Sequence, residues 1–103
     1  MNINFAGKLY LSDASLSREV IRRELASARP RRWWYVVLPI SKGPDLLEIV
    51  SLRELVKPLH RDCDITIIGA AKGYHRSLRL VEQMIGDLYA ADKDMNVHDF
   101  FDF

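Results

Sequence analysis

The sequence predicts a small α/β-type protein, an α+β two-layer sandwich whose elements follow the order β-α-β-β-α-β-α. Three observations lead to this fold class. The chain has 103 residues, which suits a single domain with one core. Its apolar residues alternate in some segments and recur at the helical period in others. Turns rich in glycine and proline separate these segments, and no repeat or low-complexity linker divides residues 1–103. We therefore expect one globular domain.

An alternating segment opens the chain. Ile3, Phe5, Leu9 and Leu11 alternate with more polar neighbours, a pattern typical of a half-buried strand. Gly7 falls on the apolar phase, so it marks either a bulge or the turn of a small hairpin.

A helix is predicted next, over residues 14–28. Ser12 and Asp13 offer N-cap side chains for it. Pro30 ends it, because proline disfavours a helical conformation at Arg29. Its apolar residues lie on one broad face and comprise Leu16, Val20, Ile21, Leu25 and Ala28.

The middle of the chain predicts two further strands. Residues 33–38 are aromatic and β-branched, which favours a strand buried on most of both faces. Residues 45–61 are ambiguous. We prefer a short strand over 46–50, followed by a helix that starts at a Ser51–Glu54 capping box. One continuous helix there would instead give a small doubly wound β-α-β-α-β-α parallel sheet.

The stretch Asp64–Leu88 predicts a buried strand at Ile65–Ile68, a glycine loop at Gly69–Gly73 and a helix over Tyr74–Tyr89. Gly86 inside this helix costs about 1 kcal/mol relative to alanine and would permit close approach of a neighbouring element. The apolar stripe expected to face the core comprises Leu78, Val81, Ile85, Leu88 and Tyr89, with Met84 beside it.

The first six predicted elements match the element order of a ferredoxin-like split βαβ fold, with the helix over 74–89 added at the C-terminal end. This likeness concerns element order alone. In such a sheet, the loop at Ser12–Asp13 and the glycine turn would lie at opposite ends. In the doubly wound alternative they would gather at one edge, where ligands bind.

Composition narrows the class of protein. The formal net charge is +1, which favours neither a nucleic-acid nor a membrane partner, and no apolar run approaches the ~18 residues of a membrane span. The single cysteine, Cys63, excludes an internal disulfide framework. We therefore expect a cytoplasmic protein with no membrane partner.

The neutral total hides an uneven distribution of charge. Residues 18–32 hold six arginines and two glutamates, a balance of +4, whereas residues 87–103 hold five aspartates and one lysine, a balance of −4. The tail over 92–103 also carries three phenylalanines, so we expect it to dock on this domain or on a partner. The opposite charges suggest a head-to-tail or swapped dimer.

One candidate site is an anion-binding turn. Backbone N–H groups and the helix dipole favour an anion at the start of the helix over 74–89. The turn lacks both the Walker pattern and the dinucleotide spacing, and the alternative is a tight turn with solvated cations. The candidate residues are Gly69, Lys72, Gly73, His75 and Arg76.

A second candidate is an interaction surface. Arginines beside aromatic residues provide the phosphate pairing and stacking of single-stranded nucleic-acid binding, although the aromatic-glycine signature of RNA-binding modules is missing. The alternative is that the aromatic residues fill the core. The candidate interaction residues are Arg29, Arg31, Arg32, Trp33 and Trp34, with Phe100, Phe101 and Phe103 from the tail.

No catalytic residue, metal or cofactor is predicted. His60 and Cys63, flanked by Asp62 and Asp64, form one His/Cys pair where zinc needs two. No pair of carboxylates is placed for acid–base work. The leading hypothesis is a non-catalytic module for protein–protein interaction or self-association. Binding of a phosphate- or nucleotide-type ligand at Gly69–Arg76 is the alternative, and single-stranded nucleic-acid binding through Arg29–Tyr35 is the third.

Overall fold

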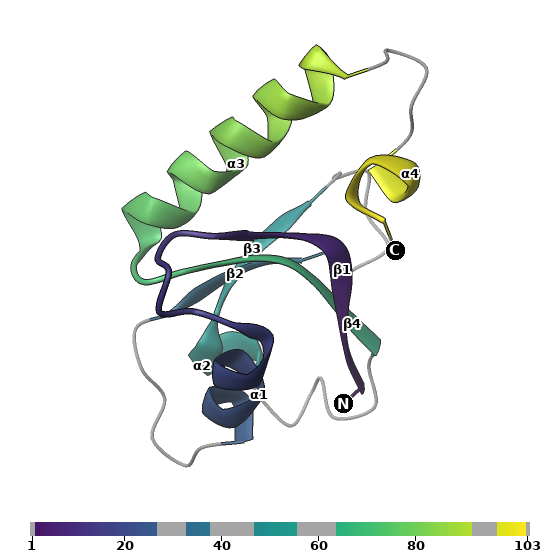
Figure 1. The fold of residues 1–103 in the computed structure, drawn as a ribbon. Helices are drawn as coiled ribbons and strands as arrows, with labels where there is room; N and C mark the ends of the chain where they lie inside the picture. Colours follow the sequence, from purple (N-terminus) through teal and green to yellow (C-terminus); the bar gives the residue numbers. More distant parts are fainter. Residues whose placement is uncertain (1, 27–32, 38–46, 56–63, 92–96, 103) are drawn as a thin grey trace.

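A mixed β-sheet lies at the centre of the molecule (Figure 1). The computed structural model describes the chain except for residues 1, 27–32, 38–46, 56–63, 92–96 and 103. The strands are β1 (Asn2–Leu11), β2 (Trp34–Val37), β3 (Glu48–Ser51) and β4 (Asp64–Ala71). The helices are α1 (Arg18–Ala26), α2 (Leu52–Leu55), α3 (Tyr74–Ala90) and α4 (Val97–Phe101).

The strand order across the sheet is β1-β4-β2-β3. β1 pairs with β4 in parallel, whereas β2 is antiparallel to both β4 and β3. The α+β class is thereby confirmed. The ferredoxin-like strand order is not confirmed: β1 lies at an edge and β4 takes an interior position.

The ambiguous stretch begins with a strand, as preferred. β3 covers Glu48–Ser51, and α2 follows directly. The Ser51 hydroxyl accepts the backbone N–H of Glu54 at 3.1 Å, which is the serine half of the predicted capping box. The doubly wound alternative is therefore wrong, because this sheet contains antiparallel pairs on both sides of β2.

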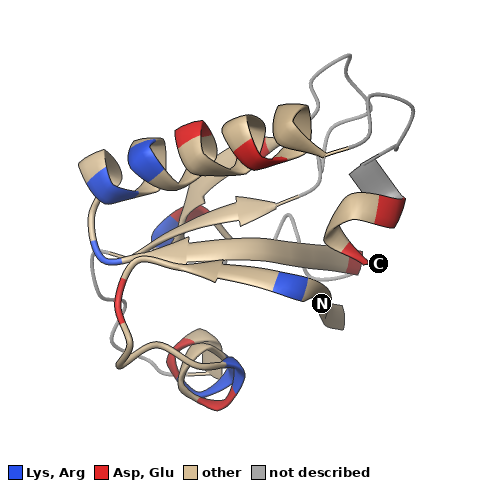
Figure 2. Ribbon diagram, turned by 45° about the horizontal axis from the view of Figure 1, so that its top comes forward, with Lys and Arg blue, Asp and Glu red and all other residues tan. Residues whose placement is uncertain are grey.

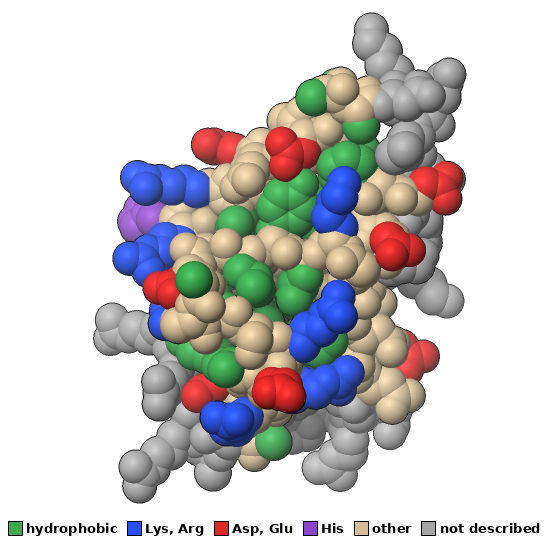
Figure 3. Space-filling view, in the orientation of Figure 1, with side chains coloured by type: hydrophobic (Ala, Val, Ile, Leu, Met, Phe, Trp, Pro, Cys, Tyr) green, Lys and Arg blue, Asp and Glu red, His purple; other side chains and the backbone are tan. Residues whose placement is uncertain are grey.

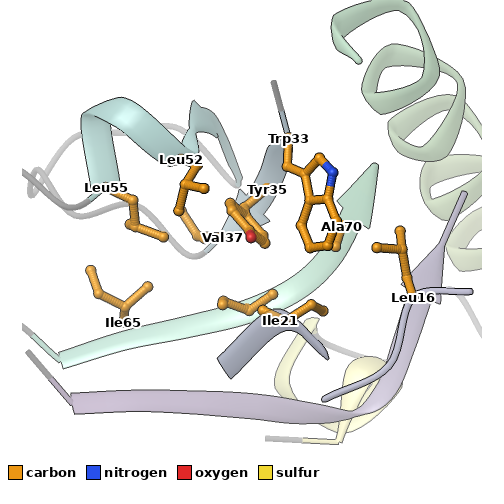
Figure 4. Close-up of a cluster of buried hydrophobic side chains, with 10 residues drawn as sticks. Leu16, Ile21, Trp33, Tyr35, Val37, Leu52, Leu55, Ile65 and Ala70 are labelled. Atoms are coloured by element: carbon orange, nitrogen blue, oxygen red, sulfur yellow. The ribbon is translucent and has the colours of Figure 1, made fainter. Parts of the chain in front are cut away.

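Helices lie against both faces of the sheet, with α1 and α2 on one side and α3 and α4 on the other (Figure 1). The first face is closed by Leu16, Ile21, Leu52 and Leu55, which surround Tyr35 (Figure 4). The Tyr35 hydroxyl is buried without a hydrogen-bond partner among the described residues. Burial, and then the nearby charge of Glu24, raises the pKa of this phenol.

The opposite face is closed by Leu80 and Met84 of α3 and by Phe100 and Phe101 of α4. β4 supplies Ile68 and Ala71 to this side and Ile65 and Ile67 to the other. After Asp64, β4 is apolar or glycine except for Thr66, as expected of a strand covered on both faces, so its burial on both faces follows from its sequence.

α1 begins later than predicted, at Arg18 rather than residue 14. Asp13 caps a separate turn, because its Oδ1 accepts the backbone N–H of Ser15 at 2.7 Å. Ser17 is the actual capping residue, since its hydroxyl accepts the backbone N–H of Val20 at 3.2 Å. Leu16, only 3% exposed, anchors the intervening residues in the core.

β1 is one continuous strand rather than a hairpin at Gly7. Its register against β4 shifts between Phe5 and Tyr10, so the irregularity expected at Gly7 is present. α4 lies against this part of the strand, and the Gly7 N–H donates to the Asp102 carbonyl at 2.6 Å. A Cβ on residue 7 would lie only 2.1 Å from Asp102 Oδ2, which explains glycine here.

α3 turns a different face to the core than the sequence predicts. Its fully or nearly buried residues are Ser77, Leu80 and Met84. Leu78, Ile85 and Tyr89, expected in the core stripe, are 37%, 40% and 77% exposed. Val81 and Leu88 are half-buried at the boundary between the two faces.

Candidate functional site

The parallel pair β1 and β4 brings two strand ends together. Leu11 is the register partner of Ala70, so both strands end at the same edge. The Ser12 N–H donates to the Ala70 carbonyl at 3.1 Å, and the Lys72 N–H donates to Ser12 Oγ at 3.1 Å. The Ser12–Asp13 loop and the turn before α3 therefore lie side by side, whereas the ferredoxin-like order would have separated them.

A hydrogen-bond network joins these two loops. Lys72 Nζ donates to Ser15 Oγ at 2.5 Å and lies 3.8 Å from Asp13 Oδ2. Hydrogen bonds from Ser15, and then the positive charges of Lys72 and Arg76, hold the pKa of Asp13 below its usual value. Lys72 and Asp13 thus largely neutralise each other at this edge.

A cleft of about 390 Å³ opens between this edge and α3. Its residues come from the end of β1, the following loop and one side of α3: Leu11, Ser12, Asp13, Arg76, Arg79, Leu80 and Gln83. The guanidinium groups of Arg76 and Arg79 make no hydrogen bond or ion pair with another described residue. Figure 3 shows cationic side chains gathered around a histidine where α3 begins.

The predicted anion site is only partly assembled. Gly69 is inside β4 rather than in a loop, because the strand continues to Ala71. Gly73 has φ 115°, which requires glycine, and its turn is correspondingly tight. Lys72 is occupied by Asp13 and Ser15, and His75 is exposed in the first turn of α3. Of the five predicted residues, Arg76 alone lines the cleft.

The described members of the predicted interaction set do not lie together on one surface. Trp33 is 7% exposed and belongs to the core on the α1 side. Trp34 is half-buried, with its ring centroid 4.8 Å from that of Tyr74. Phe100 and Phe101 are buried on the α3 side of the sheet. Arg29, Arg31, Arg32 and Phe103 lie outside the described residues.

The described residues contain no group of three His, Cys, Asp or Glu side chains that would hold a metal ion. His60, Asp62 and Cys63 lie outside the described part of the chain. Asp64 is exposed, and its Oδ1 accepts a hydrogen bond from Asn2 Nδ2 at 2.9 Å.

No described helix is long and apolar enough to cross a membrane.

The most prominent surface feature is an apolar stripe along α3, defined here as Tyr74, Leu78, Ile85 and Tyr89 and called the outer stripe. These four side chains are 46%, 37%, 40% and 77% exposed. With about 100° per residue, they fall within an arc of about 60° on the helix. The helical period in the sequence revealed three of them, but as core residues.

Comparisons with protein-family models, with curated proteins and with solved structures gave no match to this chain.

Proposed function

We propose that this protein is a non-catalytic, cytoplasmic interaction module that self-associates, with the outer stripe of α3 packing against the same stripe of a second copy. The observation that carries this proposal is the exposure of four large apolar side chains on one narrow arc of the longest helix. Water contact with aligned apolar side chains is unfavourable, and burying them against another chain would remove it.

Gly86 flanks the outer stripe, about 60° beyond Tyr89 around the helix. It is exposed in α3, next to Ile85 in sequence and one turn before Tyr89. A Cβ at this position would meet nothing within 4 Å, so no intramolecular contact requires glycine. A glycine that costs a helix about 1 kcal/mol is explained if a neighbouring chain approaches closely at this point.

A second copy is expected to pack in antiparallel orientation, about a two-fold axis near the middle of the outer stripe, which makes the contact self-complementary. The charged residues of α3 are basic in its first half and acidic in its second (Figure 2). At about 100° per residue, all but Glu82 lie more than 90° around the helix from the centre of the stripe, so the proposed contact is mainly apolar. The same axis would bring Tyr74 of one copy towards Tyr89 of the other and Leu78 towards Ile85.

The interface is expected to be weak. α3 has 17 residues, about 25 Å of helix at 1.5 Å per residue. A single-helix stripe of this length falls below the roughly 800 Å² per partner of a stable interface. We therefore expect a concentration-dependent dimer with a dissociation constant in the micromolar to millimolar range.

Sedimentation equilibrium over this concentration range tests the proposal. Leu78→Glu should keep the protein monomeric throughout, because it places a carboxylate in the apolar contact. Ala26→Glu adds the same charge at an exposed position of α1 and should dimerise like the unmodified protein. The proposal is overturned if the unmodified protein stays monomeric at millimolar concentration. It is also overturned if the Leu78→Glu variant dimerises normally.

A further inference from the structure

The cleft between the end of β1 and α3 lies on the other side of α3 from the outer stripe. Its helical residues are Arg76, Arg79, Leu80 and Gln83. At about 100° per residue, their arc is centred more than 100° from that of the outer stripe. The cleft would therefore remain open in the proposed dimer, and what it binds is a separate question.

Hydrogen-bond donors dominate the polar lining of this cleft. Arg76 and Arg79 each carry five N–H groups, and none of these donates a hydrogen bond to a described residue. Gln83 adds an amide from the next turn of α3. An arrangement with many donors and few acceptors suits a ligand made of oxygen acceptors.

The charge balance in the cleft favours an anion with more than one negative charge. The one carboxylate in the lining, that of Asp13, lies 3.8 Å from Lys72 Nζ, so this pair cancels. Arg76 and Arg79 then leave a local charge of about +2. A phosphate monoester carries about −1.5 to −2 at neutral pH and has three free acceptor oxygens, which match this charge and donor count better than one carboxylate.

The size and floor of the cleft allow more than a bare ion. Its volume of about 390 Å³ falls in the range of small-molecule sites. Leu11 and Leu80 provide apolar contact. The Asp13 carboxylate already accepts the Ser15 N–H, but a carboxylate has about four acceptor sites, so it can also accept a hydrogen bond from a hydroxyl group. These features suit a small hydroxylated organic group attached to the phosphate.

We propose that this cleft binds the phosphate group of a small, hydroxylated phosphate monoester, with Arg76 and Arg79 as the anchoring side chains. The site differs from the turn that the sequence indicates. Lys72 and the glycines shape the edge of the sheet, and two arginines and a glutamine of α3 face the ligand.

NMR titration of the full chain tests this assignment. The probes are inorganic phosphate and glycerol phosphate, with succinate as a carboxylate and sodium chloride at matched ionic strength. We expect saturable shifts of the Arg76, Arg79 and Gln83 side-chain signals with both phosphates, and tighter binding of glycerol phosphate. Shifts that follow ionic strength alone, or equal binding of succinate, would overturn the proposal.

Matched variants separate a site from general electrostatic attraction. Arg76→Gln with Arg79→Gln should weaken phosphate binding at least tenfold. Arg23→Gln with Arg53→Gln removes the same charge from exposed positions of α1 and α2 and should leave binding unchanged. Equal weakening by both double variants contradicts the assignment.

The monomeric Leu78→Glu variant should bind phosphate like the unmodified protein. This control distinguishes failure of the cleft from failure of the dimer, because the two surfaces share no residue. Loss of phosphate binding in this variant, with the helix content of α3 intact, would contradict the independence of the two sites.

Discussion

The inner and outer faces of α3 carry similar apolar side chains in opposite surroundings. Leu80 and Met84 on the inner face are 5% and 0% exposed, whereas Leu78 and Ile85 on the outer face are 37% and 40% exposed. The helix is apolar around so much of its circumference that its sequence alone leaves two arcs to choose from. The comparison shows that apolar character makes a residue suitable for a core without assigning it to one.

Two small residues determine which face of α3 packs against the sheet. Gly69 of β4 leaves the space that the end of Met84 fills, since a Cβ there would lie 2.5 Å from Met84 Cε. Ser77 is fully buried, and its hydroxyl donates to the Tyr74 carbonyl at 2.5 Å. These two small residues allow α3 to approach the sheet closely along its inner arc, as close packing requires.

The sharpest test of this comparison uses two leucines that are two residues apart. Leu80→Ala should lower the free energy of unfolding by about 2–5 kcal/mol, because it leaves a cavity over the sheet. Leu78→Ala should lower it by less than about 1 kcal/mol in dilute protein, since its side chain is already partly in water. Urea denaturation measures both, and similar losses at the two positions would contradict the assignment of the faces.

A second test adds volume beneath the inner face. Gly69→Ala should destabilise the protein by about 1–3 kcal/mol, because its Cβ would meet Met84 Cε at 2.5 Å and the Tyr10 carbonyl at 3.2 Å. Combining it with Met84→Ala should recover part of this loss, because the shortened side chain frees the space. Additive losses in this double-mutant cycle would show that the two residues do not compete for space.

On the outer face the equivalent substitution has the opposite sign. Gly86→Ala should raise the stability of dilute monomer by up to about 1 kcal/mol, because its Cβ meets no atom within 4 Å and alanine is the better helix former. At high concentration it should weaken the dimer, since it fills the proposed point of close approach. Thermal unfolding and sedimentation of the same variant measure these two effects, and destabilisation of the monomer would be inconsistent with an open outer face.

The smallest expected effect concerns the hydrogen bond that joins β1 to α3. Tyr10 Oη donates to Asp87 Oδ2 at 2.6 Å. Partial burial, and then Asp87, raises the pKa of Tyr10 to about 12. Because the folded state favours the neutral phenol, this contribution to stability is present below pH 10 and is lost as the pH rises towards 12.

Asp87→Asn should lower the pKa of Tyr10 part of the way towards 10, because the charge disappears while the burial remains. Ultraviolet titration of the phenols, taken as the difference from a Tyr10→Phe variant, measures this shift. An unchanged pKa would mean that Asp87 does not influence Tyr10 in solution.

Sequence patterns within one segment predicted the helices and strands better than they predicted which strands pair. β1, β2, β3 and α3 lie close to their predicted ranges, because alternation, β-branching and the helical period act over a few neighbouring residues. β4 begins where predicted but continues past Ile68 to Ala71, into the predicted glycine loop. The start of α1 was predicted too early, because Ser12, Asp13 and Ser17 all offer capping side chains and the burial of Leu16 favours the last. Strand order depends on which segments meet across the chain, and the predicted order was not confirmed.

The candidate cleft shows the same difference between what a local sequence pattern predicts and what long-range contacts decide. Arg76 was named from the sequence because it is near a glycine turn, whereas Arg79 and Gln83 were not among the candidate residues. Their position one turn further along α3 becomes relevant once the end of β1 lies beside them. That juxtaposition comes from the parallel pairing of β1 with β4 across more than fifty residues of chain.

By itself, the sequence determined the class of the fold, the buried character of β4 and the amphipathic character of α3, because each follows from side-chain pattern within one segment. Only the tertiary structure decided which arc of α3 is buried and which loops meet at the sheet edge. Those choices depend on contacts between distant residues, such as Met84 over Gly69 and Ser12 beside Lys72. Both proposed surfaces, the outer stripe and the cleft, arise from these long-range contacts.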